Sequence, residues 1–404
     1  MQPTPGTGQR TAPDDAAVAA AANALTERWA GALPDGAERS TVFSGAGVWP
    51  LLGLLALGAA GATRRRLAAA FGLDLALAEG AVRRLLNVFD ASDSMYAACG
   101  LWQHPDVVLD PVWRDAVPPG TRGELTGDPG ADQDRLDAWA RDQTRGMIER
   151  APVTVTPDTV LMLASAVSLE TAWATPFTKQ RRTAHAGPWR AEGLAWLERA
   201  AQSEDLARVD GPAGPVTLAR VPGKADLDVY LLLGAPQATA ASTLGTALAA
   251  LGGAYPVVPA SAWSGPDPAP GASVAPITNP SGRPELRLGC PPFAFQARHD
   301  LLALPGVFGL QPGGEYPGIG SARGLPLGVG QAAQGAMTQF TELGFKAAAV
   351  TAVGVRAMAV ARPLAPKPTT RTTVAFDRPF GFAAVHRASG LVPVAGWVAR
   401  PGSD

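Results

Sequence analysis

Residues 342–363 read ELGFKAAAVTAVGVRAMAVARP, a run of Ala, Val, Gly and Thr with little charge. Ala is the best helix former, but Gly354 and its β-branched neighbours disfavour a helix. Side chains alternate between the two faces of a strand, and the two charges within residues 345–358, Lys346 and Arg356, fall on even positions. The odd face therefore carries no charge, and no proline interrupts the run before Pro363. The stretch favours a strand that can enter the middle of a sheet.

The composition of the chain allows a large folded core. The chain has 404 residues, of which 47% are apolar and 17% charged, and its net charge is −1. This is enough for one large domain or two ordinary ones. The balanced charge gives no indication of a nucleic-acid partner.

Cysteine and histidine are too sparse to suggest a metal site. Cys99 and Cys290 lie far apart in the sequence, which predicts two separate buried thiols. The histidines occur singly, without a second ligand at metal-binding spacing, at positions His104, His185, His299 and His386. We expect neither a metal nor a cofactor.

The N-terminus lacks the basic and Leu-rich regions of a signal peptide. Asp14 and Asp15 precede an Ala run, which suits a helix cap. Residues 1–14 are predicted to be a disordered tail, and no window is long and apolar enough to span a membrane. A cytoplasmic, membrane-free protein is the default expectation, with an extracellular location as the alternative.

Hydrophobic periodicity predicts helices mainly in the first half of the chain and strands mainly in the second. Neither alternating βα units nor a repeat appears, so we predict an α+β fold in a single large domain. Residues 254–283, rich in Pro, Gly and Ser, are expected to be a surface excursion. The predicted helices cover residues 15–33, with Trp29 inward, the interval 40–73, residues 132–148 and residues 239–251. The predicted strands cover residues 94–103, 159–173, 216–233 as a pair, 285–295, 332–342, and two short segments within the last 30 residues.

Motifs of the common hydrolases and nucleotide-binding proteins do not occur. The sequence contains no G-x-S-x-G elbow, P-loop, H-E-x-x-H or S-x-x-K motif. Ser321, in GIGSARG, has neither a hydrophobic strand before it nor the required spacing. We therefore expect that the chain is not an enzyme.

Four segments together resemble the serpin family of protease inhibitors. Their order and spacing match the family over residues 15–402, and the chain is identified as a divergent, bacterial-type member. The segments are VFSGAGVWPLLGLLALGAAGAT (42–63), SAVSLETAWATPF (165–177), ELGFKAAAVT (342–351) and DRPFGFAAVHRASGLVPVAGWVARP (377–401).

The resemblance implies a serpin domain over residues 15–402, with helices around a large central sheet, smaller sheets, and an exposed reactive-centre loop at about 343–372. It also implies suicide inhibition of a serine or cysteine protease. In that mechanism the protease cleaves the loop, and the cleaved loop inserts into the central sheet while the acyl-enzyme is still intact. We expect a monomer whose partner is the target protease.

The hinge of this loop contains one departure from the family. The hinge residues implied by the resemblance are Glu342, Gly344, Phe345, Ala347, Ala348, Ala349 and Thr351. Phe345 stands where inhibitory serpins usually carry Thr or Ser. Because forcing a large ring into a packed sheet costs about 1–3 kcal/mol, we expect Phe345 to slow insertion. The alternative function is therefore a non-inhibitory serpin-fold protein that acts as a substrate or binding protein.

Counting from the hinge, the family pattern implies Met358–Ala359 as the reactive bond, which suits chymotrypsin-like or elastase-like proteases. The alternative bond, Arg356–Ala357, would suit a trypsin-like pocket with a carboxylate. The loop length leaves the register open by about two residues.

A polar cluster beneath the sheet, often called the shutter, is also implied. In this chain its positions correspond to Ser44, Gly47, Ser165 and Gln334, and Trp173 corresponds to the tryptophan where the sheet opens. Gln334 can both donate and accept hydrogen bonds. Gly45 replaces the proline that is usual in the family.

Overall fold

The computed structural model describes residues 14–34, 38–118, 122–146, 148–183, 188–189, 193–346 and 367–401. Six of its helices precede residue 144, as predicted. They are α1 (Asp15–Gly31), α2 (Gly45–Gly58), α3 (Gly61–Phe71), α4 (Ala78–Asp90), α5 (Pro111–Ala116) and α6 (Pro129–Gln143), and α7 (Ala240–Leu251) and α8 (Pro305–Phe308) follow.

The first two helices begin at capping residues and bury their apolar side chains. The carboxylate of Asp14 accepts a hydrogen bond from the Ala17 amide at 2.7 Å and caps α1. Trp29 is 1% exposed, which confirms its predicted inward orientation. Helix α2 is apolar nearly all round and lies in the core, as a helix without a polar face must.

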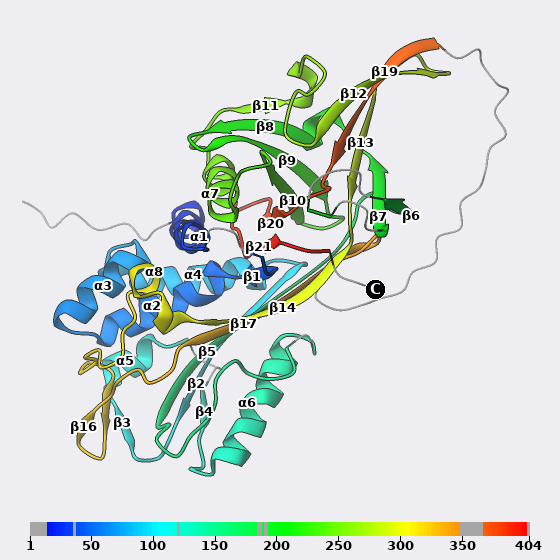
Figure 1. The fold of residues 1–404 in the computed structure, drawn as a ribbon. Helices are drawn as coiled ribbons and strands as arrows, with labels where there is room; N and C mark the ends of the chain where they lie inside the picture. Colours follow the sequence, from blue (N-terminus) through cyan, green and yellow to red (C-terminus); the bar gives the residue numbers. More distant parts are fainter. Residues whose placement is uncertain are drawn as a thin grey trace, which may run out of the picture.

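The strands form four sheets (Figure 1). The six-stranded sheet has the order β14-β17-β18-β5-β2-β4, and the seven-stranded sheet has the order β1-β21-β20-β10-β9-β8-β11. A five-stranded sheet, β12-β19-β13-β7-β6, and a three-stranded sheet, β16-β15-β3, complete the fold. The strand bounds are β1 Thr41–Phe43, β2 Met95–Gln103, β3 Val107–Leu109, β4 Arg122–Glu124, β5 Leu161–Ala172, β6 Thr178–Thr183, β7 Gly193–Ala200, β8 Leu206–Gly211, β9 Gly214–Pro222, β10 Leu227–Gly234, β11 Val257–Pro259, β12 Ala272–Asn279, β13 Glu285–Cys290, β14 Phe293–Asp300, β15 Gly320–Ala322, β16 Leu325–Pro326, β17 Ala333–Phe340, β18 Gly344–Lys346, β19 Lys367–Ala375, β20 Phe380–His386 and β21 Val394–Val398.

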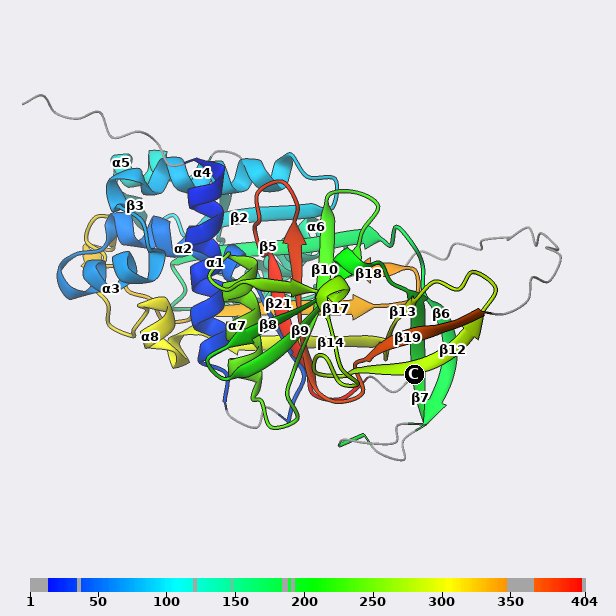
Figure 2. The same ribbon diagram turned by 90° about the horizontal axis from the view of Figure 1, so that it is seen from above.

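Strand β5 is covered on both faces, as its continuous apolar run predicts. Helix α2 lies on one face, and α6 packs on the other with Met162 and Leu136 in one apolar cluster (Figure 1). Seen from above, α2, α3 and α5 gather at one end of the molecule and the five-stranded sheet lies at the other (Figure 2).

Three predicted boundaries are wrong. The excursion at 254–283 contains β12, an eight-residue edge strand. The single strand expected at 285–295 is two strands, because Pro291 and Pro292 separate β13 from β14. The loop expected to reach residue 372 ends earlier, since β19 starts at Lys367 and pairs with β12 and β13.

The two cysteines are buried and separate, as predicted. Burial raises the pKa of Cys99 to about 12, and burial also raises the pKa of Cys290. Both thiols therefore stay protonated near neutral pH. The described residues contain no group of three metal-ligating side chains. Within the same residues, no helix has the length and apolar character needed to span a membrane.

Candidate functional site

The chain turns sharply after β17 and re-enters the six-stranded sheet as β18. The Thr341 amide donates to the Gly344 carbonyl at 3.0 Å, and the Gly344 amide donates to the Thr341 hydroxyl at 3.3 Å. We call residues 341–344 the hinge turn. Strand β18 then pairs antiparallel with β17 on one side and with β5 on the other. The first hinge residues are thus already part of the sheet.

Gly344 is required where the hinge turn meets β5. A Cβ atom at this position would lie 2.4 Å from the Thr171 carbonyl oxygen, far closer than van der Waals contact. Only glycine allows the two backbones to approach this closely.

Phe345 is buried in the sheet rather than excluded from it. Its side chain is 2% exposed, and its ring centre lies 6.0 Å from that of Phe382 in the seven-stranded sheet. A small cavity beneath the ring is lined by Val167, Met337 and Val394, among others. The space between the two sheets thus accommodates the ring in β18, and the effect of Phe345 on the rate of insertion stays a prediction.

Trp173 holds the hinge turn against the top of β5. Its indole Nε1 donates to the Thr341 carbonyl at 2.9 Å, and its backbone amide donates to the Leu343 carbonyl at 2.9 Å. The indole ring also packs on Phe340, with ring centres 4.8 Å apart. This tryptophan is thus in contact with the segment that leads into β18.

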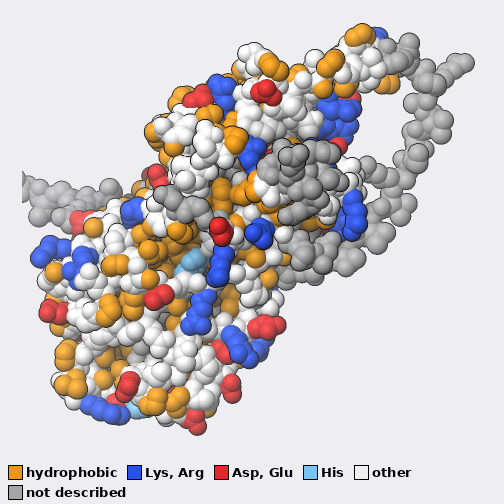
Figure 3. All heavy atoms as spheres, viewed as in Figure 1, with side chains coloured by type: hydrophobic (Ala, Val, Ile, Leu, Met, Phe, Trp, Pro, Cys, Tyr) orange, Lys and Arg blue, Asp and Glu red, His pale blue; other side chains and the backbone are white. Residues whose placement is uncertain are grey.

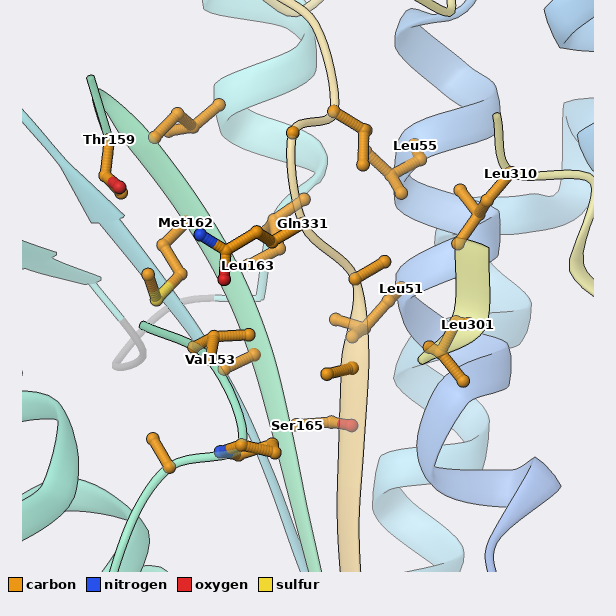
Figure 4. A pocket seen from close by; sticks show the side chains of 18 of the residues that line it. Leu51, Leu55, Val153, Thr159, Met162, Leu163, Ser165, Leu301, Leu310 and Gln331 are labelled. Carbon is orange, nitrogen blue, oxygen red and sulfur yellow. The ribbon is translucent and has the colours of Figure 1, made fainter. Parts of the chain in front are cut away.

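Below β18 the six-stranded sheet is split. No backbone pairing joins β5 directly to β17 in the part of the chain that the structure describes, because β18 lies between them at the top and nothing described lies between them below. A cavity of about 310 Å³ occupies this space. We call it the gap; its walls are residues 161–166 of β5 and residues 331–335, which lead into β17 (Figure 4).

Helix α2 forms the floor of the gap with apolar side chains. Leu51 and Leu55 project from α2 toward the space between the two strands, and Leu163 lies on the β5 wall (Figure 4). Such a lining favours small or apolar side chains over charged ones.

The first turn of α2 connects both walls of the gap. Gln334 on β17 accepts from the Ser44 amide and donates to the Ser44 carbonyl, each at 2.8 Å. The hydroxyl of Ser165 on β5 donates to the Gly47 carbonyl. The Ser44 hydroxyl donates to the Pro393 carbonyl at 2.6 Å and accepts from the Gly47 amide at 2.9 Å. The structure thus brings together all four residues of the expected polar cluster.

Two glycines let α2 approach the sheet and its neighbouring helix. A Cβ at Gly47 would lie 3.0 Å from Val167 and 3.1 Å from the Ser44 hydroxyl. A Cβ at Gly45 would lie 2.3 Å from the Thr26 hydroxyl of α1, so the family proline does not fit here. Gly45 therefore allows α1 to pack closely on α2.

The face of the gap opposite α2 is covered by the segment between α6 and β5. The amide of Gln331 donates to the Thr154 carbonyl at 3.0 Å and accepts from the Thr154 amide at 3.2 Å. Pro152 packs over Gly335, where a Cβ would lie 3.4 Å from the proline ring. A strand that entered the gap would thus be enclosed on both faces.

His299 is a member of this region that motif reasoning did not assign to the site. It lies on β14 opposite Gln334, its Nε2 is 2.9 Å from the Val42 carbonyl, and its ring packs edge-on against Trp29. Burial lowers the pKa of His299 below 6.5, although the Val42 hydrogen bond acts in the opposite direction. Its signal in the sequence, a single histidine in an alternating strand, was too weak to identify it.

The lowered pKa predicts a stability that decreases as pH falls. Because folding keeps His299 neutral, the unfolded chain binds more protons at pH values below about 6.5, and the free energy of unfolding declines there. We expect this free energy, measured by denaturant titration, to be lower at pH 5.5 than at pH 7.5. The variant His299→Gln should lose part of this difference. An equal pH dependence in both proteins would contradict the assignment.

The remaining predicted residues lie outside the described part of the chain. These are Ala347, Ala348, Ala349, Thr351, the bond Met358–Ala359 and the alternative bond Arg356–Ala357. Their roles stay predictions.

Comparison with known proteins supports the resemblance. The family model described as Serpin (serine protease inhibitor) matches residues 20–187. Serpin-Z2B of Oryza sativa subsp. japonica is 28% identical over 162 residues, which cover 37% of this chain and 37% of that protein. Its match thus spans little more than a third of the relative's length. Putative serpin-Z12 of the same plant is 27% identical over 393 residues, or 93% of this chain and 88% of that protein.

The fold is also found among solved structures. The native state of tengpin, a thermophilic serpin, aligns with a TM-score of 0.71 and 15% identity, and the alignment covers 97% of this chain and 96% of tengpin. At this identity the likeness concerns the fold, and it agrees with the α+β arrangement of helices and sheets described above.

Proposed function

This chain belongs to the serpin family, and we propose that it inhibits a serine or cysteine protease by inserting its cleaved reactive-centre loop into the gap. Serpins as a class inhibit proteases rather than catalyse reactions. The observation that carries the proposal is the position of β18. Phe345 and Lys346 already pair on both sides, and the gap lies farther along the same two strands, beyond Val167 on β5.

The pairing of β18 defines a register for the residues that would follow it. Phe345 lies opposite Thr171, and Lys346 lies opposite Glu170 and Gln339. If each further residue pairs in the same way, Thr351 lies between Ser165 and Gln334, next to the polar cluster. Val355 then lies opposite Leu161, the first residue of β5. Nine residues, 347–355, would fill the gap over about 30 Å.

The side chains of this segment suit the two faces of the gap. In the same register, odd positions share the face of Ser165, which bonds to α2. These positions hold Ala347, Ala349, Thr351, Val353 and Val355, which are small or β-branched and uncharged. The hydroxyl of Thr351 could join the polar cluster, and the valines would contact the leucines of α2.

Insertion supplies the free energy for trapping. Each new backbone hydrogen bond contributes about 1 kcal/mol net, and a strand between β5 and β17 gains bonds on both edges. The protease nucleophile attacks the Met358 carbonyl, and Ala359 leaves as a free amine while Met358 stays esterified to the enzyme. Insertion then competes with hydrolysis of that ester, so rapid insertion traps the enzyme. Phe345 already lies in the six-stranded sheet before cleavage, which favours rapid insertion of the residues that follow it.

A protease panel tests this proposal. We expect a chymotrypsin-like or elastase-like enzyme to give a covalent band larger than the chain on denaturing electrophoresis. Mass spectrometry should find a released fragment that begins at Ala359. A fragment beginning at Ala357 would move the reactive bond to Arg356 and the target to a trypsin-like enzyme. Cleavage without any covalent band would contradict inhibition and favour the alternative of a non-inhibitory serpin-fold substrate or binding protein, which Phe345 suggests from the sequence.

A further inference from the structure

Strand β19 holds the chain on the far side of the reactive-centre loop. Residues 347–366 connect Lys346, the last residue of β18, to Lys367, the first residue of β19. Strand β19 pairs antiparallel with β12 on one side and parallel with β13 on the other. Both ribbon views show β12 and β19 side by side, at the end of the molecule away from α2 and α3 (Figures 1 and 2). The chain is thus held in a sheet on either side of residues 347–366.

Strand β12 is an edge strand whose outer edge is largely closed to a further strand. The Val274 amide donates to the Pro266 carbonyl at 3.0 Å, and the Ala272 amide donates to the Ala269 carbonyl at 2.9 Å. These two amides therefore point away from β19. Pro276 has the same orientation and carries no amide hydrogen. An edge blunted in this way leaves β12 with one partner strand, which is β19.

The turn that leads into β12 is tied to the seven-stranded sheet. Arg208 on β8 donates from Nη1 to the Pro268 carbonyl at 2.8 Å. Thr217 on β9 is fully buried, and its hydroxyl donates to the Pro270 carbonyl at 2.7 Å. We call residues 266–279 the strap, because they run from these two ties along the whole length of β19. The space-filling view shows its far end projecting at the upper right of the molecule (Figure 3).

An uncut loop that enters the gap would pull on β19. In the register of the proposed function, residues 347–355 occupy the gap over about 30 Å. Residues 356–366 would then have to return along the gap to Lys367, and fully extended they span at most about 40 Å. The start of β19 lies well away from β5 and β17, so the returning chain has this separation to cover as well (Figure 1).

We propose that the strap restrains β19 and thereby keeps the uncut loop out of the gap. Entry of the uncut loop requires the first residues of β19 to leave their place between β12 and β13, which breaks two ladders of hydrogen bonds. After cleavage at Met358–Ala359 the inserting segment is no longer connected to β19, and the strap does not oppose insertion. The restraint of β19 rests on the contacts above; only its effect on insertion rests on the proposed function.

Hydrogen exchange of residues 367–375 in the intact chain tests the restraint. Ala275 alternates with Val274, so its amide faces β19, and Ala275→Pro removes a bond of the ladder. We expect exchange at least about fivefold faster, the factor for one lost backbone hydrogen bond. The matched control, Thr278→Pro, places a proline where the amide faces outward, as at Pro276, and should exchange as the wild type does. Thr217→Val, which removes one tie and keeps the side-chain shape, should also accelerate exchange.

The effect on insertion is measured without protease, as the rate at which the intact chain gains thermal stability during incubation below its melting temperature. Ala275→Pro and Thr217→Val should convert at least about fivefold faster than the wild type and Thr278→Pro. Equal exchange in all four proteins would overturn the restraint. Faster exchange with an unchanged rate of conversion would overturn its role in excluding the uncut loop. If the cut wild type gains no thermal stability, the proposed function fails instead, and hydrogen exchange still decides whether the strap restrains β19.

Discussion

Replacing Phe345 by alanine is expected to release the hinge from the six-stranded sheet and to lower the free energy of unfolding by about 3 kcal/mol. The ring is 2% exposed and packs toward Phe382, so its removal leaves a cavity between the two sheets. Truncation of a buried Phe costs about 3–5 kcal/mol when the site cannot relax. Here the hinge can withdraw, which places the expected loss at the lower end.

Two measurements check this expectation on the intact chain. Denaturant titration gives the loss in stability, and hydrogen exchange of residues 343–346 shows whether β18 leaves the sheet. Phe345→Leu should keep most of the stability because it preserves most of the buried volume. Leu343→Ala, which truncates a half-buried side chain in the hinge turn, serves as the matched control and should change exchange little. Wild-type stability and exchange in Phe345→Ala would show that the ring does not anchor the hinge.

Under the proposed mechanism, replacing Thr351 by arginine is expected to change the chain from an inhibitor into a substrate. If a cleaved loop continues the pairing of β18, residue 351 would lie between Ser165 and Gln334 and face the first turn of α2. An arginine there would bury a charge without a counter-ion, which costs several kcal/mol. Insertion would then be slower than hydrolysis of the acyl-enzyme. The fraction of protease trapped per cleavage should fall more than about tenfold. This corresponds to an activation free energy of insertion that is higher by about 1.4 kcal/mol or more.

The matched control adds the same charge outside the gap. Position 361 lies beyond Val355, where the register reaches the first residue of β5, so Ala361→Arg should still trap protease. Both variants should be cleaved at comparable rates, because neither changes the residues at the reactive bond. Efficient trapping by Thr351→Arg would contradict the register.

Much of the core could be predicted from the sequence because its patterns are strong. The apolar run of β5 predicts a strand covered on both faces, and Trp29 falls on the apolar side of α1. The four residues of the polar cluster were implied only by family resemblance. No local pattern in the sequence brings Gln334 to Ser44, which lies 290 residues away.

The missed features depend on tertiary context. Pro276 argues against a strand, yet β12 is an edge strand, where a missing amide donor is tolerated. Phe345 looked too large for the hinge because the space between the two sheets, which holds the ring, is invisible in the sequence. His299 lies at the site because β14 pairs with β17, which places His299 opposite Gln334, a residue distant in the chain.

The most direct measurement of the central claim is the melting temperature of the chain before and after cleavage within residues 350–362. If the cleaved segment enters the gap as a strand, the cut protein should melt at a much higher temperature than the intact protein, because new pairing on both edges and burial of the odd face stabilise it. The cut Thr351→Arg variant should show a much smaller increase. An unchanged melting temperature after cleavage of the wild type would contradict insertion and, with it, the proposed mechanism of inhibition.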